Sequence, residues 1–449
     1  MSVLITMTFD NEQIWVDDAQ NTWVDDAQNV FVDTDQTIIR VSDEDLPIEH
    51  FWEGSVIDFD PISFNPSTNH GGYCKMEYGS FTLKSSAFAG VGLTIPPRMF
   101  QVLIQYTPDT ESNAETLIQG TAFRTKFDRN GSVYDVYGPN YTQEFLVKID
   151  DYNGDTIAIP RALGQVDYRH CIRLPDSGGY PVYHNGYLSG TKGVDWTVED
   201  DGINISANAI DDGGGFFHLT ASAAGEVTVS GVGEIETLDD LFTWGASELG
   251  LTYDNALISN KTLSKWIDSQ GTLISYLDDI AASCCHIFYI KAGELVIVSM
   301  DTANGSRSVD EYDFYPSSYE DDTPVSTLTF DWGYRGVNVD GLDHHIADYD
   351  DSETVASAYS FGSDEDIEIY NTVNKATIRS RLETILDYLN KERARLKMKL
   401  TSGLPLPGEQ ITSVDESTHS PTTFRFFARQ LVYDFLERTV TVDGDGVIQ

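Results

Sequence analysis

A histidine and a cysteine lie close together in a glycine-rich stretch, where His70 and Cys74 are separated by Gly-Gly-Tyr. A nucleophilic cysteine needs a neighbouring base, so this pair is a candidate for covalent catalysis. Consecutive glycines are also typical of a tight turn, and we favour the turn. The adjacent pair His344 and His345 would point in different directions, which disfavours a zinc site.

Carboxylates are the most abundant reactive groups, with 72 Asp and Glu residues. With so many acids, a catalytic pair of a hydrolase cannot be distinguished from chance proximity. Residues 151–155 (Asp-Tyr-Asn-Gly-Asp) resemble the start of an EF-hand loop, but the Gly comes two positions early and Ala162 stands where the bidentate Glu belongs. We therefore predict a turn there. The sequence also lacks the Gly-x-Ser-x-Gly, Walker and His-Glu-x-x-His motifs, so we expect no enzyme, no cofactor and no metal.

One segment is basic in an otherwise acidic chain. Residues 375–399 contain eight Lys and Arg residues against three acids, out of 28 basic residues in the whole sequence. Its last part alternates strictly, with Arg393, Arg395, Lys397 and Lys399 on one side of a predicted strand and apolar residues on the other. Two interpretations stay open. The four cations pair with acids of the same subunit, or they form a contact face for a second copy or another acidic partner.

The overall charge excludes several classes of function. The chain of 449 residues carries a formal net charge of −44, which repels phosphate backbones and argues against specific binding of DNA or RNA. An acidic, lysine-poor surface is typical of proteins from salty surroundings, so we expect a marine or halophilic host. The N-terminus lacks the basic region of a secretory signal. No apolar run approaches the length of about 18 residues that a membrane span needs.

The pattern of apolar residues predicts a mainly β chain of about three domains. An eight-residue aromatic–Val–Asp–Asp repeat begins at Trp15, Trp23 and Phe31 and suggests a small meander; calcium binding by its Asp pairs is the alternative, disfavoured because the repeat holds no Gly. Short apolar runs separated by turn residues fill residues 40–230, and Asn-Gly at 130–131 predicts a hairpin. Four cysteines are too few for a disulfide framework, and we expect the adjacent Cys284 and Cys285 to be buried thiols.

Helical periodicity appears after residue 233. Thr237 caps a predicted helix that ends near residue 249, and a second helix over residues 272–284 leads directly into a hairpin at 286–300. Later, a strand at 325–332 precedes acidic loops and a long helix over 376–391. The chain ends with predicted strands at 393–400, 424–433 and 439–442.

From about residue 235 the order of these elements resembles the hub proteins of phage tails. The helix at 271–281 with its hairpin and Gly293-Glu294-Leu295 resembles the hub module whose hairpin ends in Gly-x-Leu. The stretch 403–411 (Gly-Leu-Pro-Leu-Pro-Gly-Glu-Gln-Ile) resembles the return of hub barrels after a helix and strand, and residues 428–442 resemble the terminal hairpin. The resemblance covers about half of the chain. It implies a trimer that carries two related barrels per chain and presents a pseudo-six-fold ring to the tail tube.

Together these observations predict an α+β, mainly β fold of several small β-barrel or sandwich domains with an inserted helix–hairpin module. The expected segments are 1–40 (the repeat), 41–232 (a tube-like barrel), 233–323 (the module) and 324–449 (a second barrel with one long helix). We expect a structural virion protein, made in the host cytoplasm, that closes the tail tube at its tip. Its expected partners are further copies of itself, the tube or distal tail protein, the tape-measure protein and a central fibre or spike, while the genome passes through unbound. The alternatives are a glycan-binding tail-tip protein and a cell-wall or capsule hydrolase.

Overall fold

The computed structural model describes most of the chain, and it is mainly β with three α-helices in the described part. The described residues are 2–10, 13–14, 32–33, 36–43, 46–47, 51–68, 70–84, 86–88, 97–107, 114–300, 306–309, 314–320, 324–332, 351–359, 362–367, 375–391, 393–400, 404–415 and 422–448. The predicted mainly β fold is confirmed. The predicted repeat meander and the pair at 344–345 lie outside the described residues, apart from the short flanking strands β2 (Gln13–Ile14) and β3 (Val32–Asp33).

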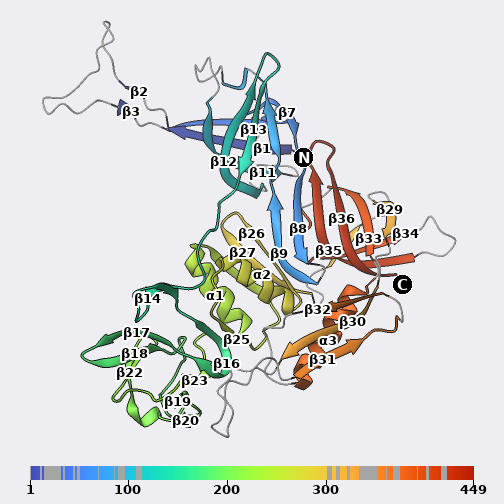
Figure 1. Ribbon diagram of the computed structural model, residues 1–449. Helices are drawn as coiled ribbons and strands as arrows, with labels where there is room; N and C mark the ends of the chain where they lie inside the picture. Colours follow the sequence, from blue (N-terminus) through green and yellow to red (C-terminus); the bar gives the residue numbers. More distant parts are fainter. Residues whose placement is uncertain are drawn as a thin grey trace, which may run out of the picture.

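The first large sheet is built mostly from the N-terminal third of the chain (Figure 1). Its inner face follows the alternation of the sequence, as in β11, where Phe100, Val102 and Ile104 are buried. The predicted Asn-Gly hairpin is present between β12 and β13, where Asp128 Oδ1 accepts a hydrogen bond from the amide of Asn130 at 2.8 Å. The strand order is β5 (Leu46–Pro47), β6 (Phe51–Gly54), β4 (Gln36–Ser42), β1 (Ser2–Asp10), β11 (Met99–Thr107), β12 (Glu115–Phe127), β13 (Ser132–Tyr137), β10 (Ser80–Leu83) and β7 (Val56–Phe59).

The second large sheet combines distant parts of the sequence. Its main path is β24 (Thr252–Leu257), β27 (Glu294–Ser299), β26 (His286–Lys291), β9 (Gly71–Glu77), β8 (Ile62–Thr68), β35 (Thr422–Asp434), β36 (Thr439–Ile448), β33 (Arg393–Lys399) and β29 (Phe314–Glu320). A branch adds β34 (Gln410–Asp415) and β28 (Ser306–Val309) beside β35. The strands predicted near the C-terminus are therefore confirmed.

The two large sheets share one hydrophobic core. Phe435, just after β35, packs against Phe59 of β7 at a ring-centroid distance of 6.0 Å and against Tyr106 of β11 at 5.5 Å. Each sheet thus covers an apolar face of the other. Next to them, α3 (Lys375–Leu389) packs on the three-stranded sheet β31 (Asp351–Ala356), β30 (Val325–Trp332) and β32 (Ser363–Asp366). The buried face of α3 includes Ile378 and Leu382.

The helix–hairpin module forms as its sequence predicts. Helix α1 (Leu238–Leu249) begins with a capping box between Thr237 and Asp240, and α2 (Leu273–Ser283) is capped by Thr272. The β26–β27 hairpin follows α2, and its apolar residues form a second core with both helices. Cys284 and Cys285 are buried thiols, as expected.

A smaller β domain is inserted between the first sheet and the module, and it extends away from the two large sheets (Figure 1). Arg161 attaches this domain to α1, because its guanidinium carbon lies 4.4 Å from the ring centroids of both Tyr187 and Trp244. A five-stranded sheet contains β20 (Ile203–Asn204), β19 (Thr197–Asp200), β23 (Val227–Val232), β16 (Arg161–His170) and β25 (Ser264–Ile267). A four-stranded sheet contains β17 (Ile172–Ser177), β18 (Tyr180–His184), β22 (Phe216–Leu219) and β21 (Ala209–Gly213), and β14 (Lys148–Asp150) pairs with β15 (Thr156–Ala158).

Strand β9 joins the module to the second large sheet. It pairs antiparallel with β8 on one edge and parallel with β26 on the other. Asp278 of α2 fixes this junction by accepting hydrogen bonds from the Ser67 hydroxyl and, at 2.6 Å, from the backbone amide of Tyr73. Gly72 is required beside it, since a Cβ there would lie 2.3 Å from Asp278 Oδ1 in a backbone with φ of +97°.

Replacing Asp278 should weaken this junction. We expect Asp278→Ala to lower the free energy of unfolding of the module by about 1–3 kcal/mol, because two donors lose their acceptor. Hydrogen exchange at the Tyr73 amide should accelerate with it. Asp278→Asn keeps an oxygen acceptor and should cost less. The control is Asp387→Ala on the exposed side of α3, expected within about 0.5 kcal/mol of wild type. Equal exchange rates at Tyr73 in wild type and Asp278→Ala would show that the contact is unimportant.

Candidate interface on strand β33

The basic strand predicted at 393–400 is β33, which lies between β29 and β36. Its apolar side belongs to the shared core, where Leu396, Met398 and the following Leu400 are each 3% exposed. The alternation predicted from the sequence is therefore confirmed for the residues whose side chains are described. The opposite side carries Arg395, Lys397 and Lys399.

Two of these cations have acidic partners within the same chain. Arg395 forms a bidentate pair with Asp443, its register partner on β36, at 2.6 Å from Nε to Oδ1 and 2.9 Å from Nη2 to Oδ2. Lys397 Nζ lies 2.9 Å from Glu437 Oε2. The hydrogen bond to Glu437 is the largest cause of the raised pKa of Lys397. Both pairs match the interpretation in which the basic strand is neutralised internally.

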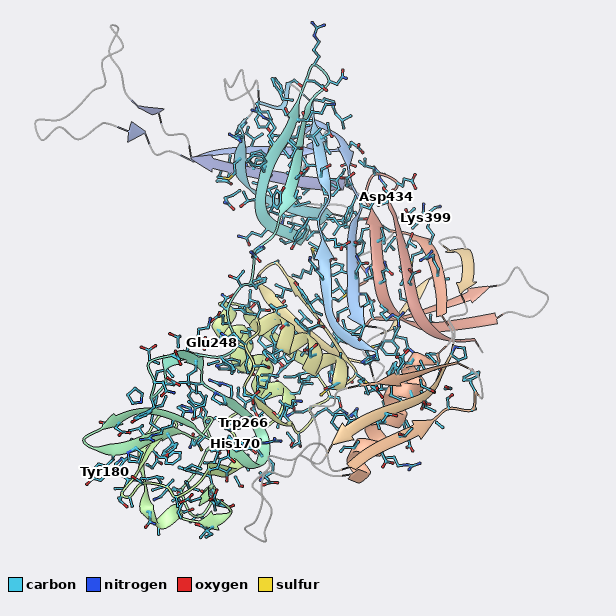
Figure 2. The ribbon with its side chains drawn as sticks, viewed as in Figure 1. His170, Tyr180, Glu248, Trp266, Lys399 and Asp434 are labelled. Atoms are coloured by element: carbon cyan, nitrogen blue, oxygen red, sulfur yellow. The ribbon has the colours of Figure 1, made fainter. Side chains whose placement is uncertain are left out.

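The remaining two cations lie at the ends of the strand. Lys399 is exposed, and its register partner Thr439 on β36 is also the register partner of Asp434 at the end of β35; Figure 2 labels Lys399 and Asp434. The backbone of Arg393 lies in register with Glu320 on one side and Asp445 on the other. The strand is thus bordered by acids of its own chain, and a role of these four residues in contacts between subunits stays a prediction.

The residues considered for catalysis do not form a reactive pair. Cys74 is fully buried on β9, where its sulfur donates to the Arg429 carbonyl at 3.6 Å, and burial raises the pKa of its thiol. His70 lies in the turn before β9, which confirms the predicted turn. Burial, and then the nearby Arg429, lower the pKa of His70 to about 4. A thiol held protonated beside a weakly basic histidine is poorly suited to nucleophilic attack.

The other predicted ligand segment is also structural. Residues 151–155 form the turn of the β14–β15 hairpin, where Asp151 Oδ1 accepts from the amides of Asn153 at 2.8 Å and Asp155 at 2.9 Å. The predicted turn is confirmed. Over the part of the chain that the structure describes, three or more His, Cys, Asp or Glu side chains are nowhere grouped as metal ligands. In the same part, none of the helices combines the length and the apolar character needed to cross a membrane.

Three features escaped sequence reasoning because each joins residues far apart in the chain. They are the Asp278 junction, the Arg161 stack between two aromatic rings, and an open cleft of about 550 Å³ in the inserted domain. A single sequence holds no signal for which distant residues pair. The one local hint was Gly71-Gly72, next to His70, because Gly72 lies at the Asp278 junction.

A charge swap tests whether Arg395 is neutralised within its own subunit. Arg395→Glu places two acids opposite each other on β33 and β36, so we expect the stability to fall by about 1 kcal/mol, modest because the pair is partly exposed. Adding Asp443→Arg should restore the melting temperature. Calorimetry of the three proteins measures both changes. A swap that fails to restore stability would mean that Asp443 is not the partner.

Acid should destabilise the fold through His70. Because the pKa of folded His70 is about 4 and that of an unfolded histidine about 6.5, the unfolded chain binds more protons between these values. The stabilisation of the fold by neutral His70 is therefore complete above pH 6.5. It is lost as the pH falls to about 4, which lowers the free energy of unfolding by about 3 kcal/mol. Denaturant unfolding of wild type and His70→Gln at pH 7 and pH 4 should show a smaller loss in the variant. His218→Gln, at a surface pair with Asp212, is the control. Equal losses in wild type and His70→Gln would contradict this assignment.

Comparison with known proteins gives matches to solved structures alone. No family model matches the sequence, and no curated protein matches it. A 43 kDa tail protein of prophage MuSo2 from Shewanella oneidensis is similar with a TM-score of 0.42 and 10% identity, covering 88% of this chain and 93% of that one. A tail protein from Neisseria meningitidis MC58 has a TM-score of 0.33 and 12% identity over 68% and 96% of the two chains. Prophage tail protein gp18 from Listeria monocytogenes has a TM-score of 0.27 and 7% identity over 67% and 94%.

Proposed function

We propose that this chain is a structural component of a phage tail, and more specifically a hub that closes the tail tube at its tip. The observation that carries the proposal is the arrangement of two large β-sheets on one core, with a helix–hairpin module attached to the second sheet. The sequence resemblance to tail hubs implies two barrels per chain together with such a module. The two sheets and the module support the hub proposal on this ground.

The chemistry of the described residues supports a structural role over an enzymatic one. In the histidine–cysteine pair that the sequence offered, burial lowers the pKa of His70 and raises that of Cys74, so the histidine is a weak base and the thiol stays protonated. The strongest polar contacts, such as Asp278 with Tyr73 and Arg395 with Asp443, hold elements of the fold together. We therefore propose that the protein performs no catalysis and needs no cofactor.

The partners follow from the same proposal. A hub is trimeric, contacts the tail tube or distal tail protein on one side and a fibre or spike on the other, and meets the tape-measure protein in the channel. A net charge of −44 suits a channel that the genome passes without binding, because like charges repel. The same charge fits a virus of a marine or salt-adapted host. We place the chain in the virion, at the tail tip, after its synthesis in the host cytoplasm.

The basic strand gives the test of assembly. We expect the double variant Arg393→Glu and Arg395→Glu to fold, by circular dichroism, and to lose the oligomer that wild type forms in size-exclusion chromatography with light scattering. The matched control is Lys126→Glu with Lys148→Glu, which reverses two exposed cations that also pair with acids of the same chain. It should assemble normally. A folded double variant that still assembles would place the interface elsewhere, and a wild-type chain that is always monomeric would contradict the hub proposal.

A further inference from the structure

The inserted domain contains the open cleft of about 550 Å³, which lies outside the candidate interface on β33. It is found where the β14–β15 hairpin meets β17 and the residue that follows β25. Its apolar lining residues are Ile157, Ala158 and Ile172. Its volume is in the range of pockets that hold small molecules.

The lining of the cleft includes the aromatic ring of Tyr152, which lies next to the guanidinium of Arg173. The Arg173 guanidinium carbon lies 4.0 Å from the centroid of the Tyr152 ring, and the Tyr152 amide donates to the Arg173 carbonyl at 3.2 Å. Asp176 fixes Arg173 from the other side, with 3.1 Å between Nη2 and Oδ1. Tyr152 nevertheless remains 51% exposed. Because contacts within the domain hold both side chains, binding a ligand would cost them little conformational entropy.

The lining also supplies two further kinds of polar group, carboxylates and a side-chain amide. Asp151 and Asn153 come from the hairpin turn, whose geometry is set by the hydrogen bonds of Asp151 to the amides of the turn. Asp268, which follows β25, also lines the cleft and is exposed. The lining of the cleft therefore combines two carboxylates, one amide and one guanidinium with three apolar side chains and a tyrosine.

This combination fits the chemistry of a sugar. A pyranose ring has a C–H face that packs on an aromatic or apolar surface and hydroxyls that both donate and accept hydrogen bonds. Carboxylates accept from these hydroxyls, the guanidinium donates to them, and the amide does both. The two carboxylates and the net charge of −44 oppose an anionic ligand. We propose that the cleft binds a neutral or amino sugar unit of a glycan.

The position of the domain leaves the cleft accessible. The β14–β15 hairpin and β17 belong to the part of the chain that extends away from the two large sheets (Figure 1). In Figure 2, Tyr180 marks the outer tip of this part, whereas Trp266 and His170 mark its inner side near β25. The inference goes beyond the proposed structural role and does not depend on it, since assembly and sugar binding use different residues.

A glycan array probed with the full-length protein tests the proposal. The array contains neutral, amino and anionic glycans, and the affinity for the best ligand is then measured by calorimetry for wild type and three variants. Tyr152→Ala removes the aromatic surface and Asp268→Asn removes one carboxylate; each should weaken binding about tenfold or more. Tyr180→Ala, which removes an exposed tyrosine outside the cleft, is the matched control and should bind as wild type does.

The outcomes separate clearly. Binding of neutral or amino glycans that both cleft variants weaken and Tyr180→Ala retains would support the proposal. If Tyr152→Ala fails to fold by circular dichroism, the exposed Asp268→Asn decides alone. Binding to no glycan, binding to anionic glycans only, or binding that the cleft variants leave unchanged would overturn it. A wild-type chain that binds sugar but is always monomeric would contradict the hub proposal alone.

Discussion

Strand β9 is the one element on which both large parts of the molecule depend. On one edge β9 pairs antiparallel with β8, which in turn pairs with the C-terminal strand β35. On the other edge it pairs parallel with β26 of the helix–hairpin module. A parallel pair of two residues is a short connection, so the side chain of Asp278 and the lack of a side chain at Gly72 must hold the strands at the right distance. The core shared by the two sheets, bridged by Phe435, then keeps the first sheet against the second.

Charge is the second constraint on this chain. The chain has 72 acidic and 28 basic residues, and several of its cations lie next to acids. Arg395 and Lys397 do so on β33, and Arg161 is placed between two aromatic rings near Glu234 and Glu248. Such local neutralisation is compatible with a surface that stays acidic elsewhere. A neighbouring subunit would then have to compete with, or add to, pairs that already exist in the monomer.

Local sequence signals were sufficient for the elements but not for their assembly. The Thr237 cap predicted where α1 begins, the apolar spacing over 272–284 predicted α2, and the alternation of Arg395, Leu396 and Lys397 predicted a two-faced strand. Capping, helical and period-two patterns all involve residues a few positions apart. The pairing of β9 with β26 and of Arg395 with Asp443 joins residues dozens to hundreds of positions apart. Composition says nothing about such pairs. The sequence predicted the basic strand of the candidate site. The acidic partners of that strand and the cleft of the inserted domain could be identified only from the three-dimensional structure.

We propose that this chain, with two sheets on one core and an attached module, is a hub subunit of a phage tail. Cryo-electron microscopy of intact particles tests it most directly, by locating this chain in the density of the tail. The account predicts a ring of three copies at the tip end of the tail tube, with the two large sheets of each copy contributing to the ring. Density that places the chain elsewhere in the particle, or particles that lack it altogether, would contradict the account.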